Sequence, residues 1–262
     1  MNRLMSTALA VAALAATSFA QEGNGKLPDY KGQLQPDKPA APDAVLGERG
    51  CIGPGRTCPS PIDRPSLFFK AEFKQPAGKE HPAAPGDVIN PNLIVRFYGP
   101  DAKNIQVAGT DVVGAEGNVS WLDPSRIWTG LTNSATAVTF ADKERYVDLT
   151  RRARIGWTGR ASGFHVLRPV IKLADGTYLM GDHGFSGTQH DYTHEEFVIK
   201  DINWRRLDIT RMVTVGEWPT SVDLTQVDEV GFGDLLPGSG HGEGGFVAVV
   251  DMSVWAQPGK RR

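Results

Sequence analysis

The chain has 262 residues, a formal net charge of −2 and 22% charged residues, so acidic and basic side chains nearly balance. A protein that binds a phosphate backbone needs a basic face, and this balance therefore argues against a nucleic-acid partner. The 30 glycines and 18 prolines interrupt the chain too often for a helical protein.

The first twenty residues read as an export signal. Arg3 gives the positive start, residues 4–17 give a short apolar core, and Ser18-Phe19-Ala20 resembles a signal-peptidase cleavage site. A membrane span needs about 20 apolar residues, and neither this run nor any later stretch is long enough. We expect a secreted or periplasmic protein, cleaved near Ala20 and without a membrane span.

Residues 21–65 are poor in large apolar side chains and rich in proline and glycine, which predicts an extended leader. This leader holds the two cysteines, Cys51 and Cys58. In an exported protein an even pair predicts a disulfide. A metal-binding pair is the alternative, but the spacing is not C-x-x-C and no histidine lies nearby.

From residue 66 to 257 the pattern becomes one of short apolar runs separated by turn residues, which is typical of an all-β protein. Ile155 and Trp157 alternate with polar neighbours, as expected of a strand with one face in the core. We predict a two-sheet antiparallel β-sandwich, a jelly roll with few or no helices, followed by a basic tail at 258–262. We expect a monomer. The predicted strands are 67–69 with 73, 93–98, 105–107, 127–129, 135–140, 153–158, 164–173, 177–180, 197–199, 203–209, 212–215, 227–232 and 246–255.

The stretch from Gly163 to Lys200 combines a strand pattern with a polar loop. Apolar residues from Phe164 to Leu173 predict a long strand, and Asp175-Gly176 is a tight-turn signal that predicts an antiparallel return. The loop that follows gathers Asp182, His183, His190, Asp191 and His194.

Four segments of the C-terminal half together resemble galactose-binding-like jelly-roll domains. They are 146–150 (YVDLT), 157–178 (WTGRASGFHVLRPVIKLADGTY), 203–209 (NWRRLDI) and 222–234 (VDLTQVDEVGFGD). The resemblance, which covers about Tyr146 to Trp255, implies a carbohydrate-binding jelly roll. It also implies a structural calcium ion held partly by Asp251, because a closing strand of these domains bears an aspartate; a local pair with Arg or Lys is the alternative. The E-x-D-x-x-E motif of laminarinase-type enzymes and the strand motifs of jelly-roll alginate lyases are missing from the sequence.

The polar loop supplies the first group of candidate site residues. Imidazoles and carboxylates bind metals and carry protons, so we assign catalytic roles to His183, His194 and Glu196. Ligand-binding roles go to Asp182, His190 and Asp191. The alternative for all of them is a solvated polar loop whose side chains bond to its own backbone.

His165 and Arg168 lie in the predicted strand beside this loop. His165 is a candidate catalytic base on a concave sheet, against the alternative of a buried, hydrogen-bonded histidine. Arg168 is a candidate for holding a sugar carboxylate, against the alternative of a local ion pair.

Six tryptophans and a glycine-rich loop complete the candidates. Sugar rings pack on exposed indoles, and Trp128 and Trp218, which lie near Gly130 and Pro219, are candidates for exposed platforms. His241 lies in the loop 238–245, whose glycines permit close approach to a ligand or form a flexible connection.

These patterns predict an exported carbohydrate-binding protein that recognises a polysaccharide or glycan in a cleft of the sandwich. One alternative is a polysaccharide-degrading enzyme, a glycoside hydrolase or lyase, that uses His and carboxylate residues. Another is a structural module of the cell envelope. The sequence does not name the sugar.

Overall fold

The computed structural model of the protein describes residues 64–76, 79–113, 119–187, 191–219, 221–242 and 244–261, with the backbone alone at 110–113 and 119–123. All of them lie in one compact unit, Gly53–Arg262. The predicted export signal, nearly all of the predicted leader, Cys51, Cys58 and His190 lie outside the described residues.

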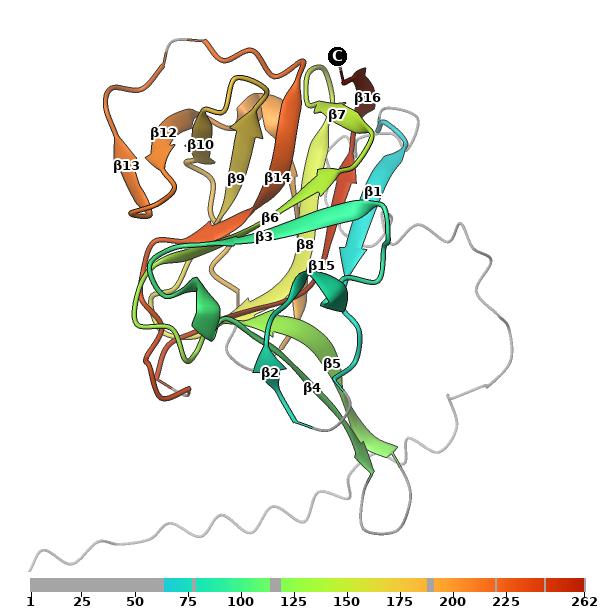
Figure 1. Ribbon diagram of the computed structural model, residues 1–262, viewed down its shortest axis with the longest axis vertical. Helices are drawn as coiled ribbons and strands as arrows, with labels where there is room; N and C mark the ends of the chain where they lie inside the picture. The colour runs from blue at the N-terminus through green and yellow to red at the C-terminus, as the bar shows by residue number, and fades with distance from the viewer. Residues whose placement is uncertain are drawn as a thin grey trace, which may run out of the picture. The chain divides into compact units, whose positions relative to one another are not determined.

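Seven strands form the first sheet, which we call the seven-stranded sheet (Figure 1). Its order is β11-β8-β15-β5-β4-β2, with β1 also paired to β15. The strands are β1 (Leu67–Glu72), β2 (His81–Pro82), β4 (Gln106–Val113), β5 (Val119–Trp128), β8 (Arg154–Ala161), β11 (Thr193–Val198) and β15 (Val247–Trp255).

The nine-stranded sheet runs β13-β12-β10-β9-β14-β6-β3, and β7 pairs with both β14 and β16. Its strands are β3 (Leu93–Tyr98), β6 (Thr136–Asp142), β7 (Arg145–Asp148), β9 (Leu167–Leu173), β10 (Tyr178–Gly181), β12 (Trp204–Asp208), β13 (Val213–Val215), β14 (Val227–Asp234) and β16 (Gln257–Lys260). Helical structure in the described part of the chain is limited to the 3₁₀ turns η4 (Pro85–Asp87), η5 (Ala102–Asn104) and η6 (Ile199–Asp201).

The hydrophobic core lies between the two sheets. Ile155 and Trp157 of β8 are fully buried, as their alternation predicted, and the Trp157 ring lies 6.4 Å from that of Phe232 on β14. A second ring contact, also 6.4 Å between centroids, joins Phe232 to Phe140 of β6. Large aromatic side chains from both sheets therefore fill one core, which confirms the predicted all-β sandwich.

The chain crosses repeatedly between the sheets. It passes from β8 to β9, from β10 to β11, back to β12, then from β14 to β15, and finally from β15 to β16. Such crossings wrap one sheet over the other, as expected of a jelly roll.

The predicted hairpin at Asp175-Gly176 is confirmed, since β9 and β10 pair antiparallel and Gly176 adopts a φ of 91°. The predicted start of that strand was wrong. Gly163 has a φ of 68° and opens a turn, so Phe164 is 91% exposed and β9 begins only at Leu167. His165 therefore lies in a loop before the strand.

Several pairings were not predicted. Residues 197–199 were expected as a short strand, but β11 starts at Thr193 and pairs along β8 in the opposite sheet from β10. The stretch expected as a basic tail contributes β16, which pairs with β7. Within the described residues, no helix is long and apolar enough to cross a membrane.

Candidate functional site

A cavity of about 490 Å³ opens beside the edge of the nine-stranded sheet, where the end of β10 meets η6, β12 and the segment after β13. Pairing of Gly181 with Trp204 brings these segments together. We call this cavity the Trp218 cavity. Its lining residues are Asp182, Ile199, Lys200, Ile202, Asn203, Trp204, Trp218, Pro219, Ser221, Val222 and Leu224.

Trp218 is the most exposed aromatic residue of this lining, with 49% of its surface open to solvent. The Arg205 guanidinium lies over its ring, 5.6 Å from the centroid, and donates two hydrogen bonds to the Gly216 carbonyl oxygen. Arg205 thereby fixes the segment that carries the indole against β12. Trp218 thus offers a positioned apolar surface at the cavity.

Asp182 places a fixed negative charge in the same cavity. Its carboxylate accepts hydrogen bonds from the Asn203 backbone N–H (2.9 Å), the Asn203 side-chain amide (2.7 Å) and His183 Nδ1 (2.8 Å). Burial alone would raise the pKa of Asp182, but these hydrogen bonds outweigh burial and lower it to about 2. The group is therefore a carboxylate throughout the ordinary pH range.

Trp204 adds an unpaired donor. Its side chain is 5% exposed and lines the cavity, and its indole N–H makes no hydrogen bond within the protein. A buried N–H without an acceptor costs stability. An exposed indole face and a fixed carboxylate in one cavity suit a polyol ligand with one apolar face.

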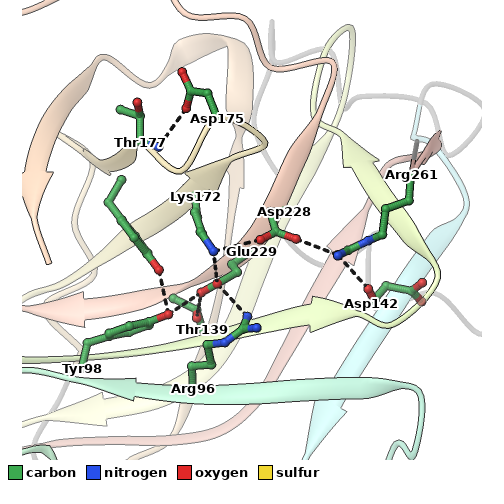
Figure 2. Close-up of polar contacts among 11 residues, drawn as sticks. Arg96, Tyr98, Thr139, Asp142, Lys172, Asp175, Thr177, Asp228, Glu229 and Arg261 are labelled. Carbon is green, nitrogen blue, oxygen red and sulfur yellow. Dashed lines mark hydrogen bonds and ion pairs between the residues drawn. The ribbon is translucent and has the colours of Figure 1, made fainter.

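A second polar cluster lies on the face of the nine-stranded sheet that points away from the core. Val230 and Phe232 of β14 face the core, so Glu229, the neighbour of Val230, faces outward by alternation, yet it is 0% exposed. Its carboxylate accepts hydrogen bonds from Arg96 (2.7 Å), Tyr98 (2.9 Å), Thr139 and Lys172 (3.0 Å), as Figure 2 shows. We call this the Glu229 network.

Tyr98 and Tyr178 extend this network. Their hydroxyls are 2.8 Å apart and their rings meet edge to face. Burial, the hydrogen bond with Tyr178 and the nearby Glu229 carboxylate raise the pKa of Tyr98, so its hydroxyl remains a neutral donor to Glu229. The Tyr178 hydroxyl is consequently the donor to the Tyr98 oxygen.

The structure brings only part of the predicted site together. Asp182 and Trp218 line one cavity, as a shared ligand-binding role requires. His183 is bonded to Asp182 and touches Phe197 edge-on at 6.3 Å between centroids. Arg168 donates to the Asp182 carbonyl oxygen rather than to a free carboxylate.

His165 does not line the Trp218 cavity. It is 6% exposed and its Nδ1 is bonded to Asp234, which is itself buried at the end of β14. The Asp234 carboxylate also accepts the Leu236 N–H. This corresponds to the alternative of a buried, hydrogen-bonded histidine.

His194, Glu196 and Asp251 lie together on the outer face of the seven-stranded sheet, away from the Trp218 cavity. His194 Nδ1 and Thr158 Oγ1 are 3.1 Å apart, and Thr158 also bonds to Asp251 at 3.3 Å. Glu196 is paired with Arg64 at 3.1 Å and with Arg154 at 2.7 Å. These pairings are of the local kind that the sequence left open.

Asp251 is paired with Lys70, whose Nζ is 3.8 Å from its carboxylate. Among the described residues no group of three His, Cys, Asp or Glu side chains could hold a metal ion. The calcium ion expected at Asp251 stays a prediction. A melting temperature measured with and without chelator would test the predicted ion directly.

The remaining candidates are dispersed. Trp128 packs edge-on against Phe246 at 6.3 Å and lies against Gly242 of the glycine-rich loop. His241 and Asp191 are exposed. Neither of these two nor Trp128 lines the Trp218 cavity.

No protein-family model matches the chain, and no curated protein sequence matches it significantly. Among solved structures, it is similar to the family 11 carbohydrate-binding module of the cellulosomal cellulase Lic26A-Cel5E of Clostridium thermocellum. That match has a TM-score of 0.37 and 13% identity, and it covers 69% of this chain and 97% of the module.

Two further structures show the same level of similarity. An exo-beta-agarase matches with a TM-score of 0.36 and 9% identity over 71% of this chain and 26% of its own. The carbohydrate recognition domain of Emp47p matches with a TM-score of 0.33 and 8% identity over 76% of this chain and 99% of its own. Similarity at this level assigns neither a ligand nor an activity to the chain.

Proposed function

We propose that this chain is an exported carbohydrate-binding protein and that the Trp218 cavity holds its glycan. The observation that carries the proposal is the meeting of an exposed indole, Trp218, and a fixed carboxylate, Asp182, in one cavity. A sugar ring has an apolar C–H face for the indole and hydroxyls for the polar groups.

Each lining group has a complementary part on a sugar. Arg205 covers one side of the Trp218 ring, so the sugar packs on the other side. Hydroxyl groups of the sugar donate to the Asp182 carboxylate. The Asn203 amide holds Asp182 in place, which reduces the entropy that binding would cost.

The test is binding of the mature protein to a panel of neutral and acidic polysaccharides, measured by isothermal titration calorimetry with Trp218→Ala beside the wild type. We expect loss of the indole contact to weaken binding at least about tenfold, since aromatic anchors commonly contribute 2 kcal/mol or more. Phe164→Ala is the matched control, because Phe164 is 91% exposed and does not line the cavity.

Unchanged binding in Trp218→Ala would place the glycan elsewhere on the molecule. Product analysis in the same samples separates the other two functions predicted from the sequence. A hydrolase or lyase releases oligosaccharides, whereas a structural envelope module neither binds glycan nor releases product.

A further inference from the structure

A continuous line of ion pairs crosses the outer face of the nine-stranded sheet and reaches the C-terminal strand. Lys172 bonds to both Glu229 and Asp228 at 3.0 Å, and Asp228 bonds to Arg261 at 2.6 Å. Figure 2 shows this sequence from Arg96 through Glu229, Lys172 and Asp228 to Arg261. We call this set of residues, with Asp142 and Arg145 at its end, the charge ladder.

The cations of the charge ladder are more exposed to solvent than its carboxylates. Arg96 is 39% exposed above a Glu229 that is 0% exposed, and Arg145 is 49% exposed beside an Asp142 that is 7% exposed. Lys172 and Arg261 are likewise more exposed than their shared partner Asp228. The cations therefore face the solvent, and the carboxylates lie beneath them.

Aromatic rings also hold the cations in place. Arg145 lies 5.1 Å from the centroid of Phe68, Arg261 4.8 Å from that of Tyr146, and Lys172 5.6 Å from that of Tyr178. Burial opposes protonation of Lys172, but hydrogen bonds with Asp228 and Glu229 raise its pKa, so it stays charged. Cations fixed in this way lose little side-chain entropy when an anion binds them.

We propose that the charge ladder is a docking surface for an acidic polysaccharide, a linear chain that carries carboxylate groups. Arg96, Lys172 and Arg261 are solvent-facing cations along this line, and Arg145 stands at its end against Phe68 of β1, so the carboxylates of one polymer can contact them in turn. The surface is distinct from the Trp218 cavity, and the proposal does not depend on that cavity.

The charge balance favours a polyuronate over a nucleic acid. Arg96, Arg145, Lys172 and Arg261 give four positive charges, and Asp142, Asp228 and Glu229 give three negative ones, so the ladder has one net positive charge. Phosphate backbones demand a strongly basic face. A polymer with more widely spaced carboxylates suits an outward-facing but weakly positive surface, and binding should be salt-sensitive.

The experiment measures the affinity of polygalacturonate for the Trp218→Ala protein, so that the cavity does not contribute. Arg145→Gln with Arg261→Gln removes two ladder cations but leaves Arg96 and Lys172 on Glu229. Each loss should weaken binding up to about fivefold, the size expected for an exposed ion pair. The control removes two exposed cations elsewhere, Lys103→Gln with Arg211→Gln, and should leave the affinity unchanged.

Three results would overturn the proposal. The first is full affinity in the ladder variant, and the second is equal weakening in the control variant. The third is binding of duplex DNA or phosphatidylserine vesicles as tight as that of polygalacturonate, because it would indicate a general anion surface. Melting temperatures of both variants close to that of the parent confirm that loss of binding is not loss of folding.

Discussion

Single residues of this protein show how polar groups are accommodated inside a β-sandwich. Glu229 is 0% exposed, and its burial would destabilise the fold unless its charge were compensated. Four donors from three strands provide that compensation. The residue was not singled out from the sequence, although a glutamate within the apolar strand pattern VDEVGF was the available signal.

Removal of this carboxylate tests the Glu229 network. In Glu229→Gln, Arg96 loses its counter-charge and Lys172 keeps only that of Asp228, so we expect a loss of about 2 kcal/mol in the free energy of unfolding. Fully buried pairs lose about 3–5 kcal/mol, and the loss here is smaller because Arg96 and Lys172 reach solvent. Urea denaturation measures it, and the exposed Glu80→Gln is the control. Equal stability of the two variants would contradict the role assigned to Glu229.

Asp182 makes a pH-dependent contribution. Its pKa of about 2 in the folded protein is below the unfolded value of about 3.9, so its stabilisation is present above pH 4 and disappears as the pH falls through 2. The stability difference between wild type and Asp182→Asn should therefore be constant above about pH 4 and shrink below it. Urea midpoints across this range measure the difference, and a difference that grows on acidification would show that the sign is wrong.

At the scale of elements, β14 depends on the close approach of its neighbour β6. A Cβ atom at Gly231 would lie 2.0 Å from the Val138 carbonyl oxygen and 2.5 Å from the Thr139 Cα. Both atoms belong to backbone, which cannot move aside without breaking the pairing of Gly231 with Thr139.

Gly231→Ala should accordingly destabilise the protein by about 3 kcal/mol or more, at the upper end of overpacking effects. Gly86→Ala is the matched control, because a Cβ atom there would meet no atom within 4 Å. Thermal unfolding of both variants measures the effect. Similar melting temperatures would show that the two strands can separate without cost.

Most strands could be predicted because their apolar residues alternate, and the β9–β10 hairpin because Asp175-Gly176 specifies its turn. Strands β7 and β16 lack this signal, since β16 has no buried residue and is held by pairing alone.

For the candidate site, Asp182 and Trp218 were recognised separately. Trp204 and Asn203 were missed because their place beside Asp182 follows from the β10–β12 register, which is set by the tertiary structure.

At the scale of the molecule, strand order is the property that the sequence does not reveal. The first strand pairs with β15, which joins Leu67 to Trp255, and β3 pairs with β6 across the intervening β4 and β5. Local patterns carry no information about partners so distant. Only the packing of both sheets on a shared core selects them.

This topology predicts slow folding. Pairing of segments far apart requires loop closure before native contacts form, so a sandwich of this kind folds in about milliseconds to seconds. Stopped-flow refolding monitored by the buried Trp157 and its neighbours measures the rate. Folding within microseconds would contradict the assigned strand pairing.

The pairing of β1 with β15 also determines how the domain responds to pulling. Ser66 accepts the Ala256 N–H, and Leu67 lies opposite Trp255, so the chain enters and leaves these two strands at the same end. Tension applied through the flanking segments would first detach β16 from β7. It would then open the β1–β15 ladder one hydrogen bond at a time. Force applied at the shared end of two antiparallel strands acts along the axis of the terminal hydrogen bond and loads that bond before the others. Mechanical force along the chain should therefore separate β1 from β15 in small steps, starting at the end where Leu67 lies opposite Trp255.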